Sequence, residues 1–214
     1  MVFALIASGN IFAQDDGQEL LIGSFHSGFL GANQEIWYWV YAPQAGLITV
    51  QTTGNTDTYL EAYDFFGDFI AENDDGPNGY NASLTVFAWS DEFIDFCLTG
   101  YDSMTRGQYT ISASFTPATE LAAGDTYRGN IREGEEHYFY FEASKNGYFI
   151  IETSGNTDTA LTLFDVLLEE LQFNDDGAGY PNDRIIWDVR EGRTYIVKVS
   201  TLQSGPFGLS VRYR

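Results

Sequence analysis

The sequence predicts an all-β protein made of two tandem antiparallel β-sandwich domains. Two observations support this fold class. The 214-residue chain repeats itself at a constant offset of 101 residues. Each copy consists of short runs rich in Tyr, Phe, Ile, Val and Thr, separated by Gly, Asn and Asp, as is typical of strands and turns. No segment carries a 3.6-residue apolar period of useful length, so long helices are not expected.

The repeat is clearest in two polar motifs. Gly-Asn-Thr-Asp-Thr at 54–58 recurs at 155–159, and Asn-Asp-Asp-Gly at 73–76 recurs at 174–177. The register holds without a gap until about residue 100, where the first copy has a slightly longer hairpin. A period of this length indicates duplicated domains and not a solenoid.

The repeat and the composition divide the chain into three parts. Residues 1–14 precede the first copy, which we place at 15–117, and the second copy is 118–214. The leading segment is apolar, uncharged and ends in Phe-Ala-Gln, like the hydrophobic region and cleavage site of a secretory signal peptide. It lacks the usual basic start, so a truncated signal peptide is expected, with a short apolar strand as the alternative. No later stretch approaches the roughly 20 apolar residues of a membrane helix, so we expect no membrane insertion.

Period-2 runs predict the strands of each copy. In the second copy they lie near 137–143, 147–153, 159–165, 169–173, 184–189, 194–200 and 207–213. The first copy has the same set 101 residues earlier, with a weak additional strand around 19–25. Seven or eight short strands in a domain of roughly 100 residues indicate an antiparallel sandwich.

Alternation within a strand predicts which side chains enter the core. Phe139 and Phe141 share one face, and Tyr138, Tyr140 and Glu142 share the other. Because Glu142 is charged, its face is expected to be the outer one.

The matching strand of the first copy places Tyr38 and Val40 inward. The outward aromatic residues of the two strands are the candidate ligand-binding residues: Trp37, Trp39, Tyr41, Tyr138 and Tyr140. Exposed aromatic rings stack on sugar rings or proline-rich polymers, and an exposed flat apolar patch marks a contact surface. Alternatively, these rings pack under a loop or against the other copy.

The charge of the chain excludes some partners. Lys and Arg total 10 against 31 Asp and Glu, which gives a formal net charge of −21. Such a field repels nucleic acid and disfavours an anionic membrane surface. With 44% hydrophobic and 16% aromatic residues, the chain nevertheless has enough apolar material for a core, so disorder is not expected.

Residue types that usually carry catalysis are scarce. The two histidines, His26 and His137, are not at equivalent positions, and neither a His-Glu-x-x-His nor a Gly-x-Ser-x-Gly motif occurs. Cys97 is the only cysteine, and its register, that of Lys198, places it on the outer face. No His or Arg lies nearby in the sequence to activate it, so we expect an unreactive, semi-buried thiol. The sequence therefore predicts no catalytic residues and no enzyme activity.

The acidic loops are candidate calcium sites. Ca²⁺ takes six to eight oxygen ligands. Oxygen-bearing side chains gather on two segments of each copy: Asp57, Asp64, Asn73, Asp74 and Asp75, and then Asp158, Asp165, Asn174, Asp175 and Asp176. The alternative is a turn role, in which Asn and Asp cap their own backbone and Gly76 or Gly177 takes the positive φ.

The order and spacing of these motifs resemble the bacterial pre-peptidase C-terminal domain family. The second copy carries the pattern at Glu135, Glu136, Phe139, Phe141, Gly147, 158–159, Leu161, 163–165, 174–177, 192–195 and Gly205. The first copy matches at 57–58, Leu60, 63–64, 73–76, Gly107 and Tyr109, and departs at 91–93. The resemblance implies jelly-roll sandwiches similar to the collagen-binding modules of secreted bacterial collagenases. Such modules are not catalytic, some bind calcium, and some adhere to insoluble polymers.

Together these features predict an exported, non-catalytic binding or adhesion module, with Ca²⁺ as the one candidate cofactor. The expected partner is an extracellular polymer, either protein or polysaccharide, or an envelope protein. The expected location is secreted, periplasmic or at the cell surface. Two alternatives remain: a structural component of the envelope or matrix, and an accessory or inhibitor that acts on a secreted protease.

Overall fold

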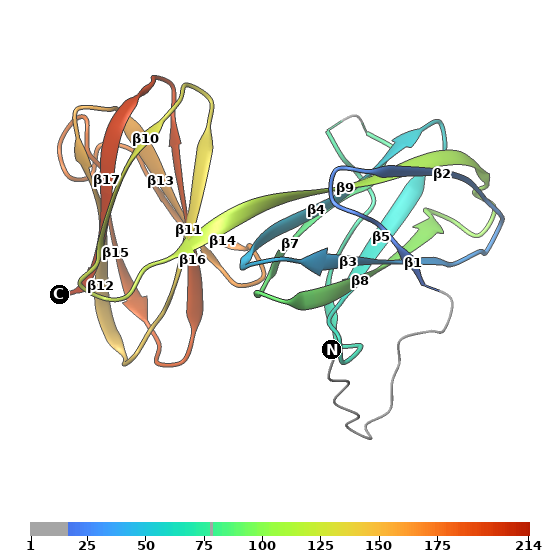
Figure 1. Ribbon diagram of the computed structural model, residues 1–214, viewed down its shortest axis with the longest axis horizontal. Helices are drawn as coiled ribbons and strands as arrows, with labels where there is room; N and C mark the ends of the chain where they lie inside the picture. The colour runs from blue at the N-terminus through green and yellow to red at the C-terminus, as the bar shows by residue number, and fades with distance from the viewer. Residues whose placement is uncertain (1–16, 78) are drawn as a thin grey trace, which may run out of the picture. The chain divides into compact units, whose positions relative to one another are not determined.

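The computed structural model describes residues 17–77 and 79–214, and the regular structure in this part of the chain is entirely β (Figure 1). The segment 1–14, expected to be a signal peptide, lies outside the described residues. Within the described part, no helix is long and apolar enough to span a membrane. The all-β prediction is confirmed.

The chain forms two compact units. Unit 1 runs to Pro43 and resumes at Ile48–Phe115, and unit 2 comprises Gln44–Leu47 and Thr116–Arg214. The sequence-based boundary after residue 117 falls inside the strand Gly107–Glu120, whose residues from Thr116 onward belong to unit 2.

Each unit is a sandwich of two sheets. In unit 1, sheet A1 has the order β1 (Gln18–Glu19), β3 (Ile36–Ala42), β8 (Glu92–Gly100), β5 (Thr58–Tyr63) and β6 (Phe69–Asn73). Sheet B1 has the order β2 (Phe25–Leu30), β9 (Gly107–Glu120), β4 (Gly46–Gly54) and β7 (Ser83–Ala88).

Unit 2 repeats this order of strands. Sheet A2 comprises the end of β9, then β11 (Glu136–Glu142), β16 (Thr194–Thr201), β13 (Thr159–Asp165) and β14 (Glu170–Asn174). Sheet B2 comprises β10 (Thr126–Ile131), β17 (Gly205–Tyr213), β12 (Gly147–Gly155) and β15 (Arg184–Val189). Because equivalent strands take equivalent places, each unit is the same sandwich.

Local bonds recur between the units as well. Thr56 Oγ1 donates to the Gln108 carbonyl at 2.6 Å, and Thr157 Oγ1 donates to the Pro206 carbonyl at 2.7 Å. In both units the threonine of the Gly-Asn-Thr-Asp-Thr motif thus fastens the loop before β5 or β13 to the opposite sheet. The repeated pentapeptide is therefore a structural element of the sandwich.

Two strands and two pairings differ from the sequence-based expectation. β2 and β10 were not predicted, and the weak strand expected around 19–25 is replaced by the two-residue β1. Both missed strands contain a central glycine, Gly28 or Gly129, and glycine is not a strand signal. The sandwiches are antiparallel as predicted except at one edge of each A sheet, where β1 pairs with β3, and the end of β9 with β11, in parallel.

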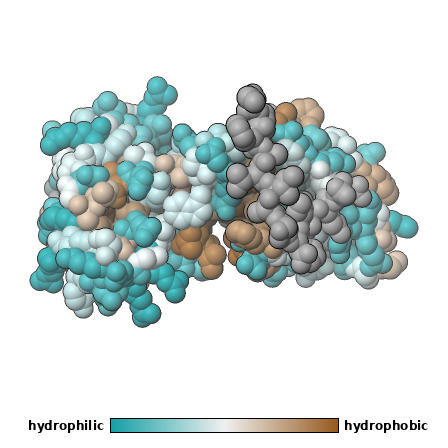
Figure 2. Space-filling view, turned by 60° about the horizontal axis from the view of Figure 1, so that its bottom comes forward, coloured by the Kyte–Doolittle hydropathy of each residue, from teal (hydrophilic) through white to brown (hydrophobic). Residues whose placement is uncertain are grey.

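The core of each unit lies between its two sheets. Tyr38 and Val40 in unit 1, and Phe139 and Phe141 in unit 2, are at most 2% exposed, as alternation predicts. The outer surface differs from the core in being mostly hydrophilic. Figure 2 shows one face of the molecule, on which hydrophilic residues predominate and hydrophobic residues form separate patches.

Candidate functional site

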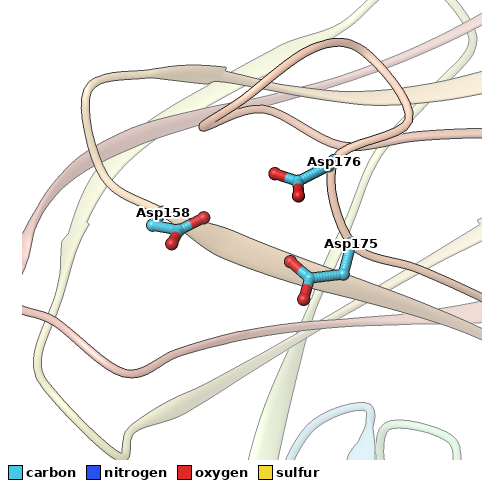
Figure 3. Close-up of side chains that lie close together, drawn as sticks. All are labelled: Asp158, Asp175 and Asp176. Carbon is cyan, nitrogen blue, oxygen red and sulfur yellow. The ribbon is translucent and has the colours of Figure 1, made fainter.

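Three acidic side chains of unit 2 meet at one edge of sheet A2. The ligand oxygens of Asp158, Asp175 and Asp176 all lie within 4.8 Å of one another, and Figure 3 shows the three carboxylates turned toward a common space. β13 and β14 are antiparallel, so the residue before β13 and the residues after β14 come to the same edge. Burial, and then the charges of Asp176 and Asp158, raise the pKa of Asp175. Such a group of carboxylates suits a divalent cation.

A fourth acid, which the sequence analysis did not select, supports this loop. Asp183 is 0% exposed, and its carboxylate accepts hydrogen bonds from the Asp176 N–H at 2.9 Å, Thr159 Oγ1 at 2.6 Å and Thr153 Oγ1 at 3.1 Å. Burial raises the pKa of Asp183, and these hydrogen bonds oppose the rise. The one available signal was a difference between the copies, because Ala82 stands at this position in unit 1.

The corresponding acids of unit 1 also influence one another. Burial raises the pKa of Asp57, and the charges of Asp75, Asp74 and Asp102 raise it further. The Asn73 side chain is used locally, since its Oδ1 accepts the Asp75 N–H at 2.7 Å. Unit 1 therefore gathers Asp57, Asp74 and Asp75 near one edge without the buried aspartate that unit 2 has.

Asp64 and Asp165 do not join these groups. Asp64 follows β5 whereas Asp57 precedes it, and six extended residues separate their ends by about 20 Å. The Asp64 carboxylate instead accepts the N–H groups of Phe66 and Asp68, at 2.8 and 2.9 Å. The Asp165 carboxylate likewise accepts the N–H groups of Leu167 and Glu169. The expectation that these two acids share a cation with the others is not met, because strand length keeps them apart.

The turn role applies to the asparagines, although not with the expected glycines. Asn174 Oδ1 accepts the N–H groups of Gly177 and Arg184, at 2.7 and 3.2 Å. Neither Gly76 nor Gly177 takes a positive φ. In the described residues of these loops that conformation falls on Gly79 in unit 1, with φ 70°, and on Asp176 and Gly179 in unit 2, with φ 85° and 93°.

The outer face of sheet A1 gathers aromatic rings. Besides Tyr59, it carries six rings that have ring neighbours on this face: Trp37, Trp39, Tyr41, Tyr63, Phe69 and Phe93. These six rings touch in two groups of three. Centroid distances are 5.5 Å for Trp37–Tyr63 and 5.8 Å for Tyr63–Phe69 in one group, and 5.6 Å for Trp39–Phe93 and 5.1 Å for Tyr41–Phe93 in the other. We call this set the A1 aromatic face. Its rim is exposed, since Tyr41, Phe93 and Phe69 have exposed fractions of 38%, 42% and 53%.

Polar groups lie between these rings. Asp95 is directly opposite Trp39 on one side and Tyr63 on the other, and burial raises its pKa. Cys97 is opposite Trp37 and 2% exposed; burial, with nearby carboxylates, raises its pKa to about 12. The thiol is therefore neutral and shielded, which agrees with the expected unreactive state.

The two predicted tyrosines of unit 2 belong to a different sheet. Tyr138 and Tyr140 lie half-buried on the outer face of sheet A2, so the five predicted aromatics do not form one stripe. Tyr138 Oη donates to Glu136 Oε2 at 2.7 Å, and Tyr140 Oη donates to Glu120 Oε2 at 3.4 Å. Trp37, Trp39 and Tyr41 are brought together on β3, as expected.

Comparison with known proteins yields structural similarities only. No family model matches the chain, and no curated protein matches it. Similar solved structures include the pre-peptidase C-terminal domain of a collagenase from Bacillus anthracis, with 14% identity over 45% of this chain and 95% of that one (TM-score 0.40). PliG of Aeromonas hydrophila, a periplasmic inhibitor of g-type lysozyme, has 14% identity over 45% and 97% (TM-score 0.36). Tripeptidyl peptidase 2 has 9% identity over 92% and 24% (TM-score 0.32).

At this level of similarity, membership of the pre-peptidase C-terminal family stays a prediction. What the chain binds has to be inferred from its own side chains. The two places that offer chemistry are the A1 aromatic face and the carboxylates around Asp158.

Proposed function

We propose that the protein is an exported, non-catalytic binding module of the pre-peptidase C-terminal type. It attaches to an extracellular polymer or an envelope partner through the A1 aromatic face. The observation that carries this proposal is the gathering of six rings on one sheet face, three of them at least 38% exposed. Contiguous exposed apolar patches on soluble proteins mark interaction surfaces.

The construction of this face suits an extended ligand. Its rings stand on paired strands, so the backbone beneath them is held by ladder hydrogen bonds and little order is lost on binding. Aromatic rings give large contact areas with few rotatable bonds. Asp95 and Glu61 lie among the rings and can accept hydrogen bonds from hydroxyl or amino groups of a bound chain.

A binding assay tests this proposal. The purified protein is titrated against fibrillar collagen, insoluble cellulose, chitin and a soluble basic peptide. Trp39→Ala combined with Phe93→Ala removes two touching rings, and we expect binding of the recognised polymer to fall at least about tenfold, because aromatic anchors dominate interface energies. Tyr148→Ala is the control, since Tyr148 is 56% exposed in sheet B2. Unchanged binding in the double variant would contradict the proposal.

We propose in addition that Asp158, Asp175 and Asp176 bind Ca²⁺, which the convergence of their oxygens within 4.8 Å favours. A ligand that binds only the folded state raises stability by mass action, by about 2.7 kcal/mol at a hundred times its Kd. We expect the melting temperature to rise between excess chelator and millimolar Ca²⁺, and Asp175→Asn to abolish most of the rise. The effect of Asp75→Asn shows whether the acidic loop of unit 1 contributes to the rise in melting temperature. Identical melting curves with and without Ca²⁺ would rule out a stabilising site.

A further inference from the structure

Charge is distributed very unequally along the chain. The first 115 residues contain fifteen Asp and Glu against a single basic residue, Arg106, whereas the remainder contains sixteen against nine. Arg106 directly precedes β9, which belongs to sheet B1. Among the residues that the structure describes, the outer face of sheet A1 therefore carries carboxylates and no cationic Lys or Arg side chain.

One carboxylate on this face stands without a partner. Asp95 is half-buried between Trp39 and Tyr63 in the cross-strand register. Within 17–77 and 79–214, no hydrogen bond or ion pair reaches its side chain. Directly opposite residues of paired strands have Cβ atoms about 5 Å apart, so both rings flank the carboxylate. A partly desolvated carboxylate is costly unless a cation or hydrogen-bond donor compensates it.

Unit 2 shows how the same sheet face is satisfied. There Lys198 Nζ lies 3.1 Å from Glu136 Oε1 and 5.9 Å from the centre of the Phe164 ring, so one ammonium contacts a carboxylate and an aromatic ring together. Phe164 stands where unit 1 has Tyr63, and Lys198 stands where unit 1 has Cys97. Unit 1 thus keeps rings and carboxylates on this face but lacks the lysine.

We propose that the A1 aromatic face takes a basic polypeptide, with a Lys or Arg side chain placed over Trp39 and Tyr63 and paired with Asp95. This inference rests on the proposed function, because it assigns a ligand class to the same face. Lys198 shows that an ammonium on this face can contact a carboxylate and a ring together, and the partner's cation would do so in unit 1. The acid involved is specific to unit 1, because the position of Asp95 holds the buried Ile196 in unit 2. Cations are attracted to the faces of Trp and Tyr rings, most strongly where both groups are partly desolvated.

The charge of the chain selects this occupant over others. A second copy of the chain, with its own net charge of −21, and any anionic polymer are repelled from the face. A neutral polysaccharide can stack on the rings and donate hydroxyl hydrogen bonds to Asp95, but it brings no positive charge and gains nothing from the surrounding negative field. A polypeptide rich in Lys or Arg compensates that charge and gains from the surrounding field.

The test uses a short oligolysine peptide, titrated against the full chain by calorimetry at about 0.15 M salt. At that ionic strength the Debye length is about 8 Å, so close contacts outweigh the general attraction to an acidic protein. Asp95→Asn keeps the shape of the side chain and removes its charge, and Trp39→Ala removes one ring. We expect each variant to bind the peptide at least about tenfold more weakly.

The control is Asp188→Asn, which removes one charge from an exposed position in sheet B2 and is expected to leave binding within about twofold. Melting curves establish that each variant is folded. Equal weakening by Asp188→Asn and Asp95→Asn would mean unspecific attraction and overturn the inference, as would peptide binding that does not respond to Asp95→Asn. If a neutral polysaccharide binds through Trp39 and the peptide does not bind, the inference is overturned but the proposed function stands. If nothing binds through Trp39, both fail.

Discussion

Replacing Phe141 by Ala is expected to lower the free energy of unfolding of unit 2 by about 3–5 kcal/mol. Phe141 is 1% exposed and stacks on Phe149, with ring centroids 4.4 Å apart, and on Tyr195, at 5.4 Å. Truncation removes the transfer energy of a buried ring and leaves a cavity that two stiff neighbouring rings cannot fill. This loss is a large part of the stability of a domain this size.

The measurement is urea denaturation of the full chain, with hydrogen exchange to show that the loss falls in unit 2. Phe173→Ala is the control, because Phe173 is 54% exposed, and we expect it to change stability by less than about 0.5 kcal/mol. The positions equivalent to Phe141 and Phe149 hold Val40 and Ile48 in unit 1, so this stack belongs to unit 2. A loss below about 1 kcal/mol for Phe141→Ala would show that the core repacks.

Replacing Asp183 by Ala is expected to cost about 1–3 kcal/mol and to loosen the loop that carries Asp175 and Asp176. The substitution removes an acceptor from the Asp176 N–H and from the buried hydroxyls of Thr153 and Thr159. A buried donor that is left without an acceptor destabilises the folded state by its full desolvation penalty. Urea denaturation gives the stability, and hydrogen exchange of the 174–183 segment gives the mobility.

Unit 1 shows which hydrogen bonds the Asp183→Ala variant can still form. With Ala82 at the equivalent position, Thr52 and Thr58 hydrogen-bond each other directly at 2.6 Å, and Thr52 Oγ1 also donates to the Ala82 carbonyl at 3.2 Å. The threonine pair of unit 2 can therefore adapt, which places the main cost at the Asp176 N–H. Asp188→Ala, at an exposed position, is the control. Unaltered exchange in the loop would contradict the prediction.

The stability difference between the parent chain and Asp183→Ala is expected to depend on pH, and the pKa of Asp183 determines the direction. Burial raises the pKa of Asp183 in the folded state, so the folded chain binds more protons than the unfolded chain between the two pKa values. The stability contributed by this protonation is complete at a pH below the ordinary Asp range, near 4, and is lost as the pH rises through the folded pKa. We expect the stability difference between the parent chain and Asp183→Ala to be largest in acid and to shrink toward neutral pH. A difference that grows with pH would exclude this account.

The all-β class, the repeated sandwich and the side chains that face the core could all be predicted from the amino-acid sequence. These are local properties. Period-2 alternation places Phe139 and Phe141 inward whatever their partners are, and motif recurrence reveals the duplication directly. β2 and β10 escaped because their short runs contain glycine and polar residues, which are not strand signals.

The folded arrangement was needed to show which side chains meet. It separated Asp64 from Asp57 by the length of β5, placed Asp183 under the acidic loop, and set Asp95 between Trp39 and Tyr63. The pairings of Asp95 with Trp39 and Tyr63, and the bond between Asp183 and Thr153, join segments far apart in the chain. Cross-strand register is fixed by the packing of whole sheets, so composition and spacing within one segment do not contain it.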